Sequence, residues 1–305
     1  MERPYILHML TPGKRVSPFD VNMAADAGYQ VITPYAEVDA DAVAGLVQDT
    51  IFSRSPKGLA RTAVFIGGRD ALVAADLLDR ARSAMFKPFQ VSLMADPSGA
   101  YTTAAAMVAC VEQALQARHA LALKGRRMLV VGTGPVGRIA GVIAAQAGAE
   151  VHLASRGGTA AAEAVARETA RRFGVELHGA SNADAAALGA ALAQTDVLLA
   201  CAAAGAQVVG ADDLAAASSL KVAADLNAVP PEGIAGVGVS DDAKPIAGTG
   251  AVGIGALAIG NVKYQTQQRL LVQMHDAPAP LVLSFAEAFA TARAFVAEKS
   301  AAAPG

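Results

Sequence analysis

The sequence predicts an α/β fold in two lobes. Its 305 residues suffice for two domains of roughly 150 residues each. Short apolar segments typical of buried strands alternate with helical segments through both halves of the chain, which favours parallel sheets joined by helical crossovers. Between the two series, residues 102–123 are rich in alanine and contain no Gly or Pro. This stretch is long enough for one helix that bridges the lobes.

The first lobe is expected to contain four strands and three helices. Ser17 followed by Pro18 is typical of a helix start, because serine caps the first turn and proline fits its first position. The expected helices begin at Pro18 and cover 39–52 and 70–86, and the expected strands are 6–10, 31–33, 63–66 and 91–94.

The second lobe repeats the alternation. Its expected strands are 127–131, 150–154, 175–178, 197–202 and 222–227, and its expected helices are 135–147, 160–173, 184–193 and 212–217. The uncharged run 245–262 contains five glycines and a proline, so we expect a buried loop and not a membrane span. Two closing helices, 256–274 and 284–299, follow. The expected domains are 1–123, 124–255 and 256–305, the last closing back on the first lobe.

Composition excludes several classes of protein. Charged residues make up 17% and hydrophobic residues 53%, which excludes a disordered chain. A net charge of −2 and 5% aromatic residues offer little to a nucleic acid. Cys110 and Cys201 lack metal or redox spacing, so buried reduced thiols are expected. The N-terminal residues lack the pattern of a secretory signal, so we expect a cytoplasmic protein with no membrane partner.

A glycine pattern carries the first functional prediction. Gly132, Gly134 and Gly137 form G-x-G-x-x-G between an expected strand and an expected helix. The first glycine permits a tight turn, the second lets the backbone approach a pyrophosphate, and the third lets helix and strand pack closely. We therefore expect a Rossmann-type NAD(P)-binding domain beside a smaller parallel α/β substrate domain. The alternative is a glycine turn that binds nothing. The expected binding turn is Gly132, Thr133, Gly134, Pro135, Val136 and Gly137.

The end of the next strand bears on the choice of coenzyme. NAD sites usually place a carboxylate here, but this chain has Ser155 and Arg156, which suit the 2′-phosphate of NADP. NADP is therefore favoured, with NAD as the alternative if Arg156 stacks on adenine or faces solvent. Ala202 and Ala203 stand at the end of a later expected strand and are expected beside the second ribose, although an ordinary buried strand fits them equally.

The groups that usually handle protons in alcohol oxidation are missing. None of the five tyrosines is followed four residues later by lysine, and the five histidines have no evident carboxylate partner nearby in the sequence. We therefore consider a substrate that loses hydride without losing a proton. A methylene carbon between two nitrogens does this, because the nitrogens stabilise the resulting cation. Such an enzyme needs positioning and a suitable electrostatic pocket, expected in the cleft between the lobes.

Five blocks of sequence resemble the NAD(P)-dependent methylene-tetrahydromethanopterin dehydrogenases of methylotrophic bacteria. They are SPFDVNMA (17–24), DPSGAYTTAAAMVA (96–109), GTGPVG (132–137), DLNAVPPEGIAG (225–236) and GIGALAIGNVKYQTQ (253–267). Five blocks in order, in both lobes, are more than a shared Rossmann turn. The resemblance implies oxidation of methylene-tetrahydromethanopterin to the methenyl form with reduction of NAD(P), in formaldehyde oxidation. It also implies a homo-oligomer and allows methylene-tetrahydrofolate as a second carrier.

The resemblance also suggests roles for two charged residues. Asp20 and Lys263 are expected nearest the reacting ring, Asp20 to stabilise the developing cation and Lys263 to hold the carrier in register. The alternatives are a carboxylate favoured by the helix dipole for Asp20 and a surface lysine for Lys263.

Five polar residues are further candidates. Thr102 and Thr103 are expected either to bind substrate or to cap the bridging helix. Asp96, for substrate, and Asn227, for coenzyme, end strands that are expected to face the cleft. Gln267 stands where one branch of the family has histidine beside its substrate, so an acid–base role there is in doubt.

Two other functions remain open at this stage. An amino-acid or shikimate-type NADP dehydrogenase needs a Lys–Asp pair in the first lobe, and neither Lys14 nor Lys57 has an obvious acidic partner. A non-catalytic NAD(P)-sensing protein would bind coenzyme tightly and leave the substrate cleft empty.

Overall fold

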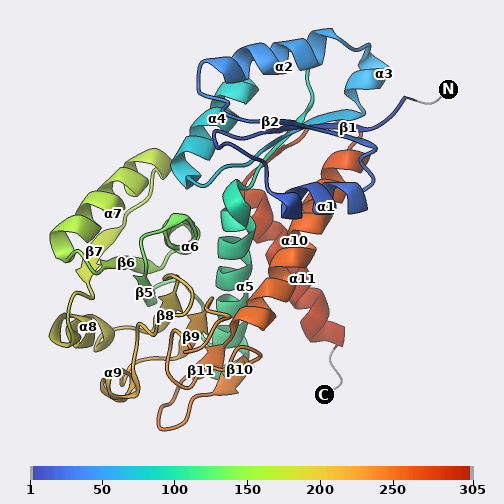
Figure 1. Cartoon of the computed structure of the whole chain (residues 1–305). Helices are drawn as coiled ribbons and strands as arrows, with labels where there is room; N and C mark the ends of the chain where they lie inside the picture. The colour runs from blue at the N-terminus through green and yellow to red at the C-terminus, as the bar shows by residue number, and fades with distance from the viewer. Residues whose placement is uncertain (1–2, 303–305) are drawn as a thin grey trace. The chain divides into compact units, whose positions relative to one another are not determined.

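The computed structural model describes residues 3–302, which form two compact units (Figure 1). The first unit holds the residues through Thr102 and Tyr264–Thr291, and the second holds Thr103–Lys263 and the residues from Ala292 onward. Each unit contains a largely parallel α/β sheet, which confirms the predicted fold class. The division falls inside three helices, α5 (Ala100–His119), α10 (Ala256–Asp276) and α11 (Phe285–Ala302), whereas the sequence places the domain boundaries outside helices.

The sheet of the first unit has five strands in the order β12-β4-β3-β1-β2, all parallel. The chain leaves β1 for β2 on one side and then returns to β3 on the other, so the strand order reverses between β1 and β3. Helices α2 and α4 lie on one side of this sheet and α1 on the other (Figure 1). The strands are β1 (Ile6–Leu10), β2 (Val31–Tyr35), β3 (Thr62–Ile66), β4 (Ser92–Ala95) and β12 (Val282–Leu283). The helices are α1 (Pro18–Asp26), α2 (Ala42–Phe52), α3 (Pro56–Leu59), α4 (Ala71–Ser83) and the 3-10 turn η1 (Pro97–Gly99).

The sheet of the second unit has seven strands in the order β10-β11-β9-β8-β5-β6-β7. Only β10 runs antiparallel to its neighbour within the described chain. The strand order reverses between β5 and β8, as in a Rossmann fold. The strands are β5 (Arg127–Val131), β6 (Glu150–Ser155), β7 (His178–Ser181), β8 (Val197–Ala200), β9 (Val222–Asp225), β10 (Asp242–Pro245) and β11 (Val252–Ile254). The helices are α6 (Pro135–Gln146), α7 (Thr159–Phe173), α8 (Ala185–Leu192) and α9 (Ala211–Ala216).

The short apolar runs of the sequence become the central strands. Every residue of β3, β8 and β9 is buried, because helices cover both faces of a parallel sheet. In the second unit, Leu129, Leu198 and Ala223 belong to one continuous apolar core. No helix in residues 3–302 is long and apolar enough to cross a membrane.

Several element boundaries differ from those expected. The helix predicted at 102–123 ends at His119, because Ala120 adopts a left-handed conformation with φ 54°. The strand predicted at 175–178 instead begins at His178. The predicted loop 245–262 contains the three-residue strand β11. Gly253 is the middle residue of this strand, so the sequence shows no run of apolar residues that would predict it. Such a short strand is stabilised by pairing with β9 and not by its own sequence.

A buried carboxylate forms the start of helix α5. Asp96 follows β4, has no exposed surface, and accepts hydrogen bonds from the backbone N–H groups of Tyr101 (2.9 Å) and Thr102 (3.1 Å). The Thr102 hydroxyl donates to its second oxygen at 2.7 Å. One carboxylate therefore satisfies three donors in the first turn of α5, where backbone N–H groups lack helical partners.

We predict that Asp96→Ala lowers the free energy of unfolding by about 3 kcal/mol, because it leaves buried donors without an acceptor. Chemical denaturation followed by circular dichroism measures this change. Asp70→Ala is the matched control. Asp70 caps α4 from an exposed position by accepting from Leu72 and Val73, so its loss is expected to cost only about 1 kcal/mol. Equal losses in the two variants would contradict the role assigned to Asp96.

Candidate functional site

Each unit has a pocket where its strand order reverses. In parallel α/β sheets, the loops that leave two neighbouring strands in opposite directions create a crevice at the carboxyl ends of those strands. In the second unit this point lies between β5 and β8, and in the first unit between β1 and β3. We describe the two pockets separately.

The glycines of the predicted motif make the turn between β5 and α6. Gly132 has φ +120°, and a Cβ there would lie 2.5 Å from the carbonyl oxygen of Cys201. A Cβ on Gly137 would collide with the carbonyl oxygen of Gly132. By contrast, a Cβ on Gly134 would meet no protein atom within 4 Å. The fold itself therefore requires Gly132 and Gly137, whereas Gly134 leaves open space beside the start of α6.

This open space belongs to a cavity of about 420 Å³, which we call the glycine-turn pocket. It brings together the predicted residues from three strand ends. It is lined by Val131, Gly132, Thr133, Gly134, Ala154, Ser155, Arg156, Gly157, Asn182, Cys201, Ala202, Ala203, Ala206 and Val208. Helix α6 starts at Gly134 without a side-chain cap, so its first N–H groups are suited to bind phosphate. The residues present therefore fit a dinucleotide.

The second strand end supplies a hydroxyl and a guanidinium. Ser155 accepts a hydrogen bond from the Gly157 N–H at 3.1 Å. Arg156 is exposed and forms no ion pair within residues 3–302. Asn182, which the sequence reasoning missed, directly follows β7, and its buried Oδ1 has no hydrogen-bond partner in the described chain. Its position after a strand of the same sheet was the available signal.

Four predicted coenzyme residues do not line this pocket. Pro135, Val136 and Gly137 lie inside the first turn of α6. Asn227 holds its own loop instead: its Oδ1 accepts from Gly205 (2.9 Å) and Val229 (3.1 Å), and its Nδ2 donates to the Pro231 carbonyl at 2.6 Å. The side chain of Asn227 therefore has a structural use that its place after β9 did not reveal.

Two titratable groups near β8 and β9 are structural. Asp225 is buried and accepts hydrogen bonds from the N–H groups of Asn227, Gly233 and Ile234 at 2.9, 2.7 and 3.1 Å. Burial nevertheless raises the pKa of its carboxyl group. Burial also raises the pKa of the Cys201 thiol to about 12, so this thiol stays protonated and is no nucleophile.

The pocket of the first unit is larger, about 850 Å³, and we call it the carboxylate pocket. It is lined by Leu10, Thr11, Pro12, Gly13, Lys14, Arg15, Val16, Ser17, Pro18, Asp20, Phe65, Gly67, Gly68, Arg69, Asp70, Val73 and Ser98. Asp20 is 4% exposed, and its Oδ1 accepts a hydrogen bond from Gln267 Nε2 at 2.8 Å. The amide of Gln267 therefore holds one oxygen of this buried carboxylate in place at the pocket wall.

Several predicted substrate residues lie elsewhere. Gln267 is fully buried and is not among the lining residues. Its side chain contacts Asp20 from behind the pocket wall. Asp96 and Thr102 are fully buried and bonded to each other, which corresponds to the capping alternative. Thr103 and Lys263 are partly exposed residues of the second unit, and neither lines the two pockets.

The sequence reasoning missed the basic residues of the carboxylate pocket. Lys14, Arg15 and Arg69 stand in loops that follow β1 and β3, and all three side chains are exposed. Ser98 also lines the pocket, has a left-handed conformation with φ 50°, and donates to the Gly68 carbonyl at 2.7 Å. Polar residues directly after strands of a parallel sheet were the signal that could have found them.

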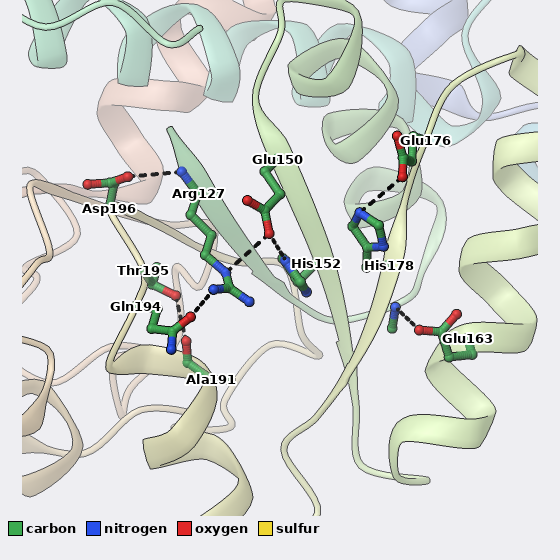
Figure 2. Close-up of polar contacts among 11 residues, drawn as sticks. Arg127, Glu150, His152, Glu163, Glu176, His178, Ala191, Gln194, Thr195 and Asp196 are labelled. Atoms are coloured by element: carbon green, nitrogen blue, oxygen red, sulfur yellow. Dashed lines mark hydrogen bonds and ion pairs between the residues drawn. The ribbon is translucent and has the colours of Figure 1, made fainter. Parts of the chain in front are cut away.

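Three of the five histidines, His152, His178 and His275, have carboxylate partners, contrary to expectation, but no histidine lines either pocket. Figure 2 shows His152 Nε2 at 2.8 Å from Glu150 and His178 Nε2 at 3.6 Å from Glu176. The hydrogen bond from His152 lowers the pKa of Glu150. Arg127 also pairs with Glu150, at 3.5 Å. Since Arg127 and Glu150 begin β5 and β6, this network lies at the edge opposite the glycine-turn pocket.

Neither pocket contains a metal-binding group. Within residues 3–302, no cluster of three or more His, Cys, Asp or Glu side chains is arranged to hold a metal ion. What the two pockets offer instead is a phosphate-binding turn in one unit and a buried carboxylate in the other.

Comparison with known proteins gives consistent matches over most of the chain. The family model described as "Methylene-tetrahydromethanopterin dehydrogenase, N-terminal" matches residues 18–98. The chain is 46% identical over 285 residues to the NAD(P)-dependent methylenetetrahydromethanopterin dehydrogenase of Methylorubrum extorquens, covering 93% of this chain and 96% of that protein. It is 34% identical over 261 residues to the Bifunctional protein MdtA of the same organism, covering 85% and 88%. Shikimate 5-dehydrogenase from Listeria monocytogenes matches in structure with a TM-score of 0.49 and 12% identity, covering 91% and 93%.

Proposed function

Because the chain belongs to the methylenetetrahydromethanopterin dehydrogenase family, we propose that it oxidises methylene-tetrahydromethanopterin to the methenyl form with reduction of NAD(P)+. The observation that carries this proposal is the buried Asp20 carboxylate, held by a neutral amide, in a pocket of about 850 Å³. No histidine or cysteine is among the residues that line that pocket. This arrangement suits a reaction that creates positive charge without removing a proton.

The chemistry explains why no base is needed. The methylene carbon of the substrate lies between two nitrogens, and one C–H bond breaks with both electrons leaving as hydride. When bound, NAD(P)+ supplies the acceptor for that hydride. The carbon becomes part of an amidinium-type cation stabilised by the nitrogen lone pairs, so the products are the methenyl cation and NAD(P)H, and atoms and charge balance.

Asp20 is proposed to stabilise this cation electrostatically. A negative charge in a largely buried site interacts more strongly with a developing positive charge than it would in water. Gln267 positions the carboxylate through the 2.8 Å hydrogen bond to Oδ1. The amide of Gln267 thus helps to fix the orientation of Asp20 and adds no charge of its own.

The glycine-turn pocket is proposed to bind the coenzyme. The backbone at Gly134 and the first N–H groups of α6 would hold the pyrophosphate. Ser155 and Arg156 would bind the 2′-phosphate of NADP, which we propose as the preferred coenzyme, with some use of NAD. Ala202 and Ala203 would lie beside the second ribose, and the unpartnered Oδ1 of Asn182 is suited to accept a hydrogen bond from a ribose hydroxyl.

Other assignments rest on the sequence and remain proposals. Lys263 is proposed to hold the carrier in register and Thr103 to contact substrate. Methylene-tetrahydrofolate is proposed as a second carrier, and a homo-oligomer in the cytoplasm as the working form. An amino-acid or shikimate-type dehydrogenase and a non-catalytic sensor are not favoured, because the family match covers nearly the whole chain.

An assay that follows the absorbance of the reduced nicotinamide coenzyme tests the function directly. The purified protein is mixed with methylene-tetrahydromethanopterin, or with methylene-tetrahydrofolate, and with NADP+ or NAD+. We expect NADPH to appear with methylene-tetrahydromethanopterin, and the methenyl product to form in equal amount. Absence of turnover with both carriers and both coenzymes would refute the proposal and favour a sensor.

We predict that Asp20→Asn lowers kcat by about 100-fold, because it removes electrostatic stabilisation of the transition state and keeps the side-chain volume. The KM for NADP should stay unchanged. Steady-state kinetics with varied NADP+ at a saturating concentration of the carrier measure both constants. Asp26→Asn is the matched control, since Asp26 is an exposed carboxylate of the same helix outside the pocket. A similar loss of kcat in both variants would contradict the role of Asp20.

We predict that Arg156→Ala raises the KM for NADP by one to two orders of magnitude, if the contact with the 2′-phosphate contributes about 1.5–3 kcal/mol. The KM for NAD should change little. Arg167→Ala, which removes an exposed arginine of α7, controls for loss of surface charge. An equal increase of KM for both coenzymes would show that Arg156 contacts adenine instead.

A further inference from the structure

Three cations line the carboxylate pocket. Lys14 and Arg15 lie in the loop after β1, and Arg69 lies in the loop after β3. None of the three side chains forms an ion pair or a side-chain hydrogen bond within residues 3–302. Their positions on two different loops at one pocket bring like charges to the same cavity, which is unfavourable unless an anion binds there.

The carboxylates of the pocket do not neutralise these cations. Asp70 uses one oxygen to accept from the N–H groups of Leu72 and Val73 at the start of α4, at 2.8 and 3.0 Å. Asp20 is buried and bonded to Gln267. Some arginines have acidic partners, for example Arg138 with Glu168 at 2.7 Å, whereas Arg156 and the three pocket cations have none in residues 3–302. The distinguishing feature here is that three such cations line one cavity.

The charges are separated by depth. Asp20 is 4% exposed and contributes to the inner wall, whereas the three cations are exposed and form the rim. The mouth of the pocket therefore carries three cations beside one exposed carboxylate, Asp70, and the inner wall carries the Asp20 carboxylate. A ligand that matches this pattern develops positive charge at its buried end and carries negative charge on the part that extends to solvent. Arginine is especially suited to bind carboxylate or phosphate through paired N–H donors.

We propose that Lys14, Arg15 and Arg69 form a subsite for an anionic tail, bearing carboxylate or phosphate, of the one-carbon carrier. This inference rests on the proposed function, because it assumes that the reacting ring of the carrier occupies the pocket beside Asp20. The subsite selects carriers by the charge of the tail, and it acts on binding and not on the hydride step.

Equilibrium binding measured by titration calorimetry tests the subsite without requiring turnover. The probe that carries carboxylates alone is tetrahydrofolate with three glutamyl residues. The probe that carries both phosphate and carboxylates is tetrahydromethanopterin, and the uncharged probe is tetrahydropteroate amide. We expect Lys14→Gln, Arg15→Gln and Arg69→Gln each to weaken binding of an anionic probe by about 3-fold, and the triple variant by about 30-fold, as exposed charge pairs of this kind allow. Binding of the uncharged probe should not change. Added salt should weaken anionic-probe binding in the unsubstituted protein and have less effect on the triple variant.

Lys57→Gln is the matched control, since Lys57 is an exposed lysine of the first unit that does not line this pocket. Both anionic probes carry carboxylates, and only tetrahydromethanopterin also carries a phosphate, so weakening of both by the triple variant supports a subsite for the anionic tail. Unchanged affinity of the triple variant for both of them, or equal weakening by Lys57→Gln, would overturn the inference and leave the proposed function intact. Failure of all three probes to bind would overturn it as well. Absence of turnover in the absorbance assay, with charge-dependent binding retained, would overturn the proposed function alone.

Discussion

Reversal of strand order in a parallel sheet is the constraint from which both pockets follow. Where the order reverses, successive loops depart toward opposite faces and do not cover the strand ends between them. This happens between β5 and β8 in one unit and between β1 and β3 in the other. The first crevice is lined with small residues and uncapped N–H groups, and the second with charged side chains. The same topology thus provides two sites of different chemistry, because the loop sequences differ.

The pairing of Asp20 with Gln267 explains how a carboxylate remains useful when buried. A lysine or arginine in place of Gln267 would form an ion pair and reduce the field available to a substrate. A hydrophobic residue there would leave the carboxylate without an internal hydrogen bond from this position and favour its protonated form. A primary amide avoids both effects, since it donates a hydrogen bond and adds no charge. The polar atoms of Asp96, in contrast, are used to begin a helix, although the sequence places both aspartates in blocks of the same resemblance.

Features of local sequence were predictable, and features that depend on distant partners were not. The Gly132 turn, the helix start at Pro18 and the alternation of strands and helices follow from spacing along the chain. The Asp20–Gln267 hydrogen bond joins residues 247 positions apart, so no spacing rule reveals it. Strand β11 depends on its neighbour β9. The role of Asn227 depends on Gly205 and Pro231, and Arg69 joins Lys14 only because β3 lies beside β1. The histidine–glutamate pairs join residues only two positions apart, His152 with Glu150 and His178 with Glu176, so the spacing along a strand could have revealed them.

The position of β12 bears on how the protein is made. This two-residue strand completes the sheet of the first unit by pairing Val282 and Leu283 with Leu93 and Met94 of β4. During synthesis, β4 emerges from the ribosome long before its last neighbour, and the whole contiguous segment of the second unit is translated in between. Until then, one edge of β4 remains open for pairing with other chains. Nascent chains of this protein therefore carry an aggregation-prone edge for most of translation, which makes cellular chaperones relevant to its yield.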